Sequence, residues 1–167
     1  IFIKRLPSDN HLFSNSLIYR SLAFHESLHL FCAGFFNQVL DEGVTEYFTM
    51  KAPNIFDTTG YSNYVSLASA LAKTFGEDVL KNMYISGDMS PMKKEFGAEL
   101  FNIILFENIP SIWPEIKDEM LKAIFDPKHD CLKLRNKIEQ IKYKSEHQAW
   151  AITDFFHTIA AVFKRSS

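Results

Sequence analysis

The stretch His25-Glu26-Ser27-Leu28-His29 decides how the rest of the chain is interpreted. On an α-helix, residues four apart point to the same side, so His25 and His29 can bind one ion together. Glu26 lies next to His25 and is displaced around the helix axis, so its carboxylate can reach a water molecule on that ion. This spacing is the one found in zinc hydrolases. The stretch therefore predicts a helix that carries one half of a metal site.

Helical periodicity extends on both sides of this stretch, from about residue 14 to Cys32. Ser14 or Asn15 supplies a side-chain oxygen that can cap the first turn, and Gly34 ends the helix. Because apolar residues lie almost all round its axis, we expect a buried helix whose polar residues need partners. These apolar residues are Leu17, Ile18, Leu22, Phe24, Leu28, Leu30 and Phe31.

Apolar residues at helical spacing, separated by Gly and Pro, predict further helices along the rest of the chain. A connector is expected over residues 35–40, with Asp41 as the N-cap of the second helix. Ile1 to Leu6 can form a short edge strand, which Pro7 ends in a turn. The predicted fold class is therefore mainly α with a small N-terminal β element. The predicted helices cover residues 42–51, 61–75, 77–84, 90–105 and 115–125, followed by one long helix or two shorter ones over 130–164.

Length and composition favour a single soluble domain without nucleic acid as a partner. With 167 residues and 47% hydrophobic content, the chain can bury one substantial core. A net charge of -2 gives no strong field for nucleic acid or anionic lipid, and no apolar run reaches the roughly 20 residues of a membrane span. Cys32 and Cys131 are too isolated to indicate a disulfide framework or a redox motif. Because so little precedes the first helix, we expect elements upstream of Ile1.

A third metal ligand is expected from the next predicted helix. A catalytic zinc ion takes three protein ligands and leaves a fourth position to water, so His25 and His29 leave one ligand to find. Glu42 and Glu46 lie one helical turn apart and would repel each other unless a positive charge lay nearby. Zinc bound by Glu42, with Glu46 accepting a hydrogen bond from the free N–H of a ligating histidine, removes that repulsion. The reverse arrangement, with Glu46 as the ligand, stays open.

Together, H-E-S-L-H and L-D-E-G-V-T-E-Y resemble the motifs of the gluzincin zinc metallopeptidases, the thermolysin-like and aminopeptidase-like group. The resemblance covers Phe24 to about Thr49. It implies that Glu42 is the third zinc ligand and that Glu46 is the acid beside the first histidine. Asp41 stands where these enzymes more usually have Asn, and the twelve residues between His29 and Glu42 form a shorter connector than in well-known members.

The resemblance further implies a zincin-like metallopeptidase helical domain over residues 1–167. Within it, residues 1–13 form the edge strand and turn, 14–51 the zinc-site helices and 52–167 a helical subdomain. A metzincin site is excluded, because Cys32 and Phe35 stand where that class has glycine and histidine. Cys32 is expected to act as a small buried hydrophobe. The residue that stabilises an oxyanion is left open among Tyr61, Tyr64, Tyr84, His147 and His157.

These inferences lead to a zinc-dependent metalloprotease that cleaves a protein or peptide substrate. Zinc at His25, His29 and Glu42 would activate water, and Glu26 would act as general base and pass the proton to the leaving amine. An endopeptidase is favoured, because no exopeptidase signature precedes the first histidine. The frequent Phe, Ile, Lys and Asn residues suggest an AT-rich, bacterial genome. A secreted or host-directed protease is a further expectation, which no residue pattern carries. The alternative is a zincin-fold interaction or structural module without catalysis, in which the histidines are core residues and the acids a solvated face.

Overall fold

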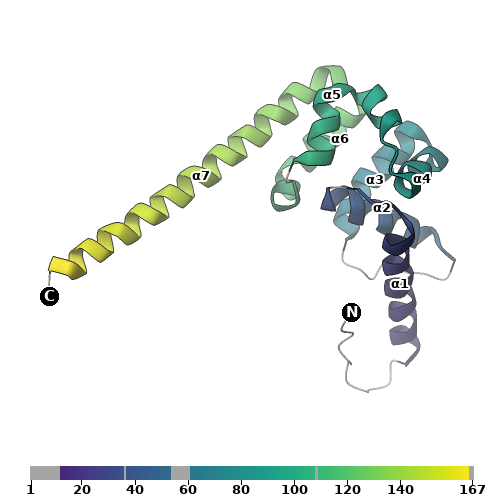
Figure 1. The fold of residues 1–167 in the computed structure, drawn as a ribbon, viewed down its shortest axis with the longest axis horizontal. Helices are drawn as coiled ribbons and strands as arrows, with labels where there is room; N and C mark the ends of the chain where they lie inside the picture. Colours follow the sequence, from purple (N-terminus) through teal and green to yellow (C-terminus); the bar gives the residue numbers. More distant parts are fainter. Residues whose placement is uncertain (1–11, 36, 54–60, 108, 166–167) are drawn as a thin grey trace. The chain divides into compact units, whose positions relative to one another are not determined.

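The structure is a computed structural model that describes residues 12–35, 37–53, 61–107 and 109–165. Across these ranges it is all-α, with seven α-helices and no strand (Figure 1). This confirms the mainly helical prediction. The β element predicted for Ile1 to Leu6 lies outside the described residues. The chain separates into two compact units, Ile1–Pro110 and Ser111–Ser167, and the prediction of a single catalytic domain stays a prediction.

The first unit contains the helices α1 to α5. The most extensive pairing joins α2 to α3, while α1 packs on α2 and α3 packs on α4. The buried apolar core of this unit draws on α2 with Leu40 and Val44, on α3 with Leu67 and Leu71, and on α4 with Leu80. The helices are α1 (Leu12–Phe31), α2 (Gln38–Lys51), α3 (Ser62–Phe75), α4 (Glu77–Ser86) and α5 (Ser90–Phe106).

The second helix, α2, begins earlier than its sequence predicts. The buried side chain of Asn37 accepts a hydrogen bond from the backbone N–H of Val39 and so caps the helix. The amide of Asn37 also donates to the backbone oxygen of Glu107, which fixes this cap to the end of α5. The prediction that Asp41 is the N-cap is therefore wrong. Asp41 lies one turn inside α2 and is left free to bind other groups.

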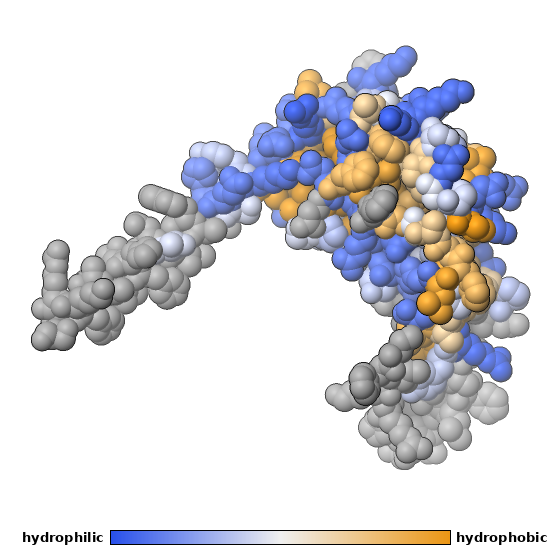
Figure 2. Space-filling view, viewed as in Figure 1, coloured by the Kyte–Doolittle hydropathy of each residue, from blue (hydrophilic) through white to orange (hydrophobic). Residues whose placement is uncertain are grey.

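The first helix, α1, is more exposed than its apolar sequence predicts. It contacts α2 along one face, where only Ser21 and His25 are fully buried among the described side chains of α1. Leu30 and Phe31 are 79% and 82% exposed, and apolar side chains reach the surface along this helix (Figure 2). The prediction of a buried helix is wrong because one neighbouring helix covers only one side of a cylinder. The helix also begins at Leu12, before the predicted caps.

A glycine allows α2 and α3 to approach each other closely. Gly43 is buried, and a Cβ atom at this position would lie 2.6 Å from the backbone oxygen of Tyr64. Because that oxygen belongs to the backbone of α3, relief of the clash would require the helices to separate. Gly43 therefore sets the distance between α2 and the first turns of α3.

The second unit is built on a pair of helices, α6 (Trp113–Phe125) and α7 (Pro127–Arg165), which follow a short 3₁₀ turn at Pro110–Ile112. Buried side chains such as Ile116, Met120, Leu134 and Ile138 come from both helices. The alternative of one long helix after Pro127 is the one observed (Figure 1). None of the helices, over the residues described, has the length and apolar character needed to cross a bilayer.

Replacing Gly43 with Ala is expected to destabilise the protein despite the better helix propensity of alanine. The substitution gains about 1 kcal/mol of helix propensity. Against this, forcing a methyl group into a packed contact costs about 1–3 kcal/mol. Here the methyl group would meet the backbone oxygen of Tyr64, which cannot move away as a side chain can. Chemical denaturation should therefore show a lower free energy of unfolding. Asn102→Ala, on the exposed face of α5, provides the matched control and should leave stability unchanged or slightly higher. A Gly43→Ala protein as stable as the control would contradict the close approach.

Candidate metal centre

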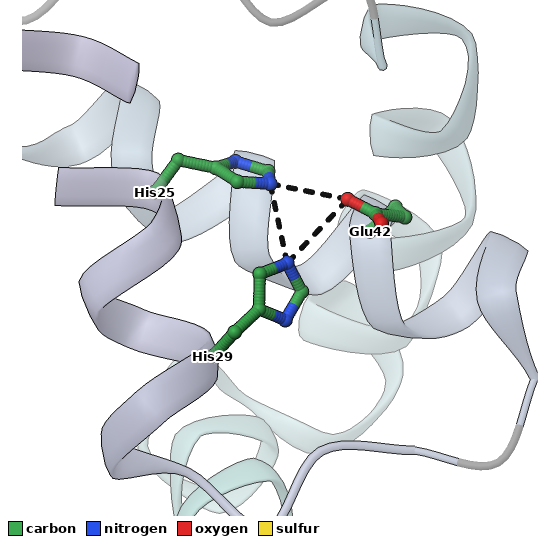
Figure 3. A group of neighbouring side chains, drawn as sticks. All are labelled: His25, His29 and Glu42. Atoms are coloured by element: carbon green, nitrogen blue, oxygen red, sulfur yellow. Dashed lines mark hydrogen bonds and ion pairs between the residues drawn. The ribbon is translucent and has the colours of Figure 1, made fainter. Parts of the chain in front are cut away.

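Two helices bring three metal-binding side chains to one point. His25 and His29 project from α1, and Glu42 projects from the second turn of α2 (Figure 3). The Nε2 atom of His25 lies 3.1 Å from Oε2 of Glu42 and 3.2 Å from Nε2 of His29. The third side of this triangle, from Nε2 of His29 to Oε2 of Glu42, measures 3.5 Å. These three residues form the group that can hold a metal ion within the described part of the chain.

The spacing of the three atoms suits a small divalent ion. Zinc–ligand distances of about 2.0–2.1 Å place the ligand atoms of a tetrahedral site about 3.3 Å apart. The observed separations of 3.1, 3.2 and 3.5 Å are close to that value, so little movement of the side chains is needed. Two imidazole nitrogens and one carboxylate oxygen are also ligands that first-row transition metals accept.

Each histidine is held at its other nitrogen by a second carboxylate from α2. The Nδ1–H of His25 donates to Oε2 of Glu46 at 3.0 Å, in the arrangement that the sequence predicts for Glu46. Nδ1 of His29 lies 3.2 Å from Oδ2 of Asp41, whose other oxygen accepts the backbone N–H of Phe35. Carboxylates in these positions orient the imidazoles and leave both Nε2 atoms facing Glu42.

The role of Asp41 was missed from the sequence. Its position before Glu42 predicts a helix cap, since aspartate at the start of a predicted helix favours that role. The available signal is the count of polar groups: two histidines that bind through Nε2 leave two Nδ1–H groups to satisfy, and Asp41 stands beside Glu42 as a further acid in the sequence.

In the absence of metal, the charges at the centre favour a proton on His25. Burial by itself lowers the pKa of His25, but the hydrogen bonds and charges of Glu42 and Glu46 outweigh it and raise the pKa above its ordinary value of 6.5. Burial tends to raise the pKa of Glu42, yet the hydrogen bond from His25 and the charges of both histidines lower it overall. A proton on His25 thus offsets one of the negative charges of Glu42 and Glu46 at the candidate metal centre.

Glu26 and Tyr61 lie at the accessible side of the centre. The side chain of Glu26 is exposed, whereas that of His25 is only 1% exposed. Burial raises the pKa of Tyr61, and the charges of Glu42 and Glu26 raise it further, so the phenol stays protonated near both carboxylates. The Tyr61 ring is stacked on the imidazole of His25 with ring centroids 5.6 Å apart.

The other candidates for an oxyanion donor lie in different settings. Tyr64 stacks on Tyr61 at a centroid distance of 6.0 Å, one ring further from the histidines. Tyr84 is buried, and its hydroxyl is paired with that of Thr45 at 2.5 Å. His147 is exposed on α7 in the second unit, where Nδ1 lies 2.9 Å from the backbone oxygen of Tyr143. The side chain of His157 lies outside the described residues.

A pocket of about 530 Å³, lined by apolar and charged side chains, lies between α1, α2 and α4. Phe24, Leu28 and Cys32 form its α1 wall, and they alternate along the chain with the two histidines. Cys32 is partly buried in the wall of this pocket. Burial raises the pKa of its thiol, which favours the neutral form. The metal-binding residues do not line this pocket.

Removing the carboxylate of Asp41 is expected to weaken metal binding. Asp41→Ala leaves Nδ1 of His29 without its acceptor, and loss of such a partner typically costs about 10–100-fold in metal affinity. Competition with a chromophoric zinc chelator measures this affinity. Glu77→Ala is the control, because the carboxylate of Glu77 contacts Tyr47 and Lys51 and no histidine. Equal affinities of Asp41→Ala and wild type would argue against the contact with His29.

Metal binding is expected to release a proton. A ligating imidazole must be neutral at the metal-bound nitrogen, whereas the raised pKa keeps His25 protonated to a pH above 6.5 in the metal-free protein. Below that raised pKa, affinity should fall by up to about tenfold for each pH unit. Calorimetric titrations with zinc in two buffers of different ionisation enthalpy measure the release. His147→Gln should release the same number of protons, and a heat independent of buffer would contradict the prediction.

Comparisons of the chain with protein-family models, with curated proteins and with solved structures found no significant match. The resemblance to gluzincins therefore rests on the two sequence motifs quoted above, and the metal centre on the geometry of His25, His29 and Glu42.

Proposed function

We propose that this protein is a zinc-dependent metalloprotease of gluzincin type that hydrolyses peptide bonds. The observation that carries the proposal is the triangle of two Nε2 atoms and one carboxylate oxygen, with sides of 3.1 to 3.5 Å, contributed by two neighbouring helices. Two histidines from one helix and a glutamate from the next are the ligand set and order of the gluzincins that the sequence resembles. Zinc is the ion that this set most often binds in hydrolases.

His25, His29 and Glu42 would hold the zinc ion, which would supply a bound water of lowered pKa and polarise a carbonyl group. The exposed carboxylate of Glu26, which follows the ligand His25 directly, supports its role as general base. Glu26 takes a proton from the attacking water and passes it to the leaving amine. Asp41 and Glu46 keep the imidazoles oriented.

The proposed substrate is a protein or peptide. The alternative is a module that keeps the fold, with or without the ion, but catalyses no reaction. Among the described residues, the group that can hold an ion has three members, and this ligand number together with the exposed carboxylate of Glu26 favours the enzyme over this alternative. A purely structural zinc site is usually closed by a fourth protein ligand.

Two substitutions separate catalysis from metal binding. Glu26→Gln should retain zinc and lose turnover by about 10²–10⁴-fold, the usual contribution of general acid–base catalysis. His25→Ala should lose both zinc and activity, because it removes a ligand. Cleavage of denatured protein mixtures, read by mass spectrometry of new peptide ends, measures turnover, and elemental analysis measures zinc.

A chelator should abolish the cleavage and added zinc should restore it. Glu77→Gln, which changes an exposed acid outside the centre, is the control and should cleave like wild type. Full activity of Glu26→Gln would rule out the mechanism. A folded wild-type protein that binds zinc and cleaves no peptide would support the structural module instead.

A further inference from the structure

Three aromatic rings form a row that begins in the metal centre. The imidazole of His25 and the ring of Tyr61 are nearly parallel, with an angle of 14° and centroids 5.6 Å apart. The ring of Tyr64 lies against Tyr61 at 25° and 6.0 Å. Tyr61 is the N-cap residue of α3 and Tyr64 lies in its first turn, whereas His25 belongs to α1. The row therefore connects a third helix to a site whose metal-binding residues come from two.

Different contacts hold the edge and the face of the His25 imidazole ring. Its hydrogen bond with Glu46 fixes the Nδ1 edge of the imidazole. Nε2 contacts Glu42 and His29, but a metal ion bound between these groups would replace both contacts. The hydrogen bond with Glu46 then remains at one edge and still allows the ring plane to tilt, which would turn Nε2 away from the ion. A parallel ring against the face of the imidazole opposes that rotation, because tilting either ring would bring their atoms into contact.

We propose that Tyr61 is a positioning residue of the metal centre: its ring, backed by Tyr64, holds the imidazole of His25 so that Nε2 faces His29 and Glu42. This inference rests on the metal site of the proposed function and needs no catalytic turnover. The ring acts by its shape, so the phenolic hydroxyl is dispensable for it. Through this contact, α3 becomes part of the metal centre.

The packing of α3 on α2 supports this role. Gly43 lets the backbone of Tyr64 approach α2 closely, next to the ligand Glu42 in the sequence. The same close approach brings Tyr61 over His25. His29 is oriented differently, because its ring meets His25 edge-on at 5.0 Å and its Nδ1 lies beside the partly exposed Asp41. Loss of Tyr61 should therefore act on the His25 side of the centre.

Metal affinity and the visible spectrum of the cobalt-loaded protein test the proposal without any substrate. Tyr61→Ala and Tyr61→Leu should each weaken zinc binding by about tenfold or more, as loss of an orienting partner does, and should change the cobalt absorption bands. Tyr61→Phe keeps the ring and should restore wild-type affinity and spectrum. Tyr47→Ala removes a tyrosine that contacts Glu77 and Phe48, and should behave as wild type.

The leucine variant keeps an apolar side chain at this position, so it stays informative if the alanine variant folds poorly. Wild-type affinity and spectrum in Tyr61→Leu would overturn the proposal, and so would a Tyr61→Phe protein as impaired as Tyr61→Leu. Failure of the peptidase proposal has a different signature: the wild-type protein binds zinc and Tyr61→Leu weakens it, yet no peptide is cleaved. A wild-type protein that binds neither zinc nor cobalt would overturn both.

Discussion

The first unit is organised around a buried set of charges between α1 and α2. Glu46 is fully buried, one of its oxygens accepts the Nδ1–H of His25, and the other has no hydrogen-bond partner among the described residues. A buried carboxylate with so few partners is costly unless a positive charge lies close by. His25 supplies that charge when its imidazole is protonated, which the raised pKa favours, and a bound cation can supply it instead. The packing of α1 on α2 therefore depends on this cluster.

Within this arrangement, α2 serves both sides of the metal centre. Its first three turns carry Asp41, Glu42 and Glu46, which contact the two histidines. Gly43, between these acids, allows α3 to approach α2 closely. A helix that packs against two neighbours can hold carboxylates against histidines with little loss of conformational entropy on metal binding, because most of the ordering is complete in the folded protein. The preorganisation of the centre thus comes from α2 rather than from the helix with the histidines.

The exposed apolar surface of α1 contrasts with this fixed interior. Only one neighbouring helix packs extensively against α1, so Leu30 and Phe31 face solvent although they are as apolar as core residues. The apolar character of a helix indicates that its burial is favourable, but it does not indicate which neighbouring element will cover it. The helix that carries His25 and His29 is consequently secured through its polar face, by the contacts of these two histidines.

By itself, the sequence determined the features that depend on local spacing. His25 and His29 share a helix face because they are four residues apart, and Glu42 and Glu46 do so for the same reason. The helix boundaries near Lys51, Phe75 and Phe125 follow from Pro, Gly and Asp residues whose effect on the backbone is also local.

Only the tertiary structure decided how these faces meet. Asn37 rather than Asp41 caps α2, because Asn37 also has a partner at the end of α5 and Asp41 is engaged by His29. The stacking of Tyr61 on His25 depends on how closely α3 packs against α2. Such contacts join residues far apart in the chain, and the packing angles between helices follow from the sum of many side-chain shapes, which periodicity along one helix does not contain.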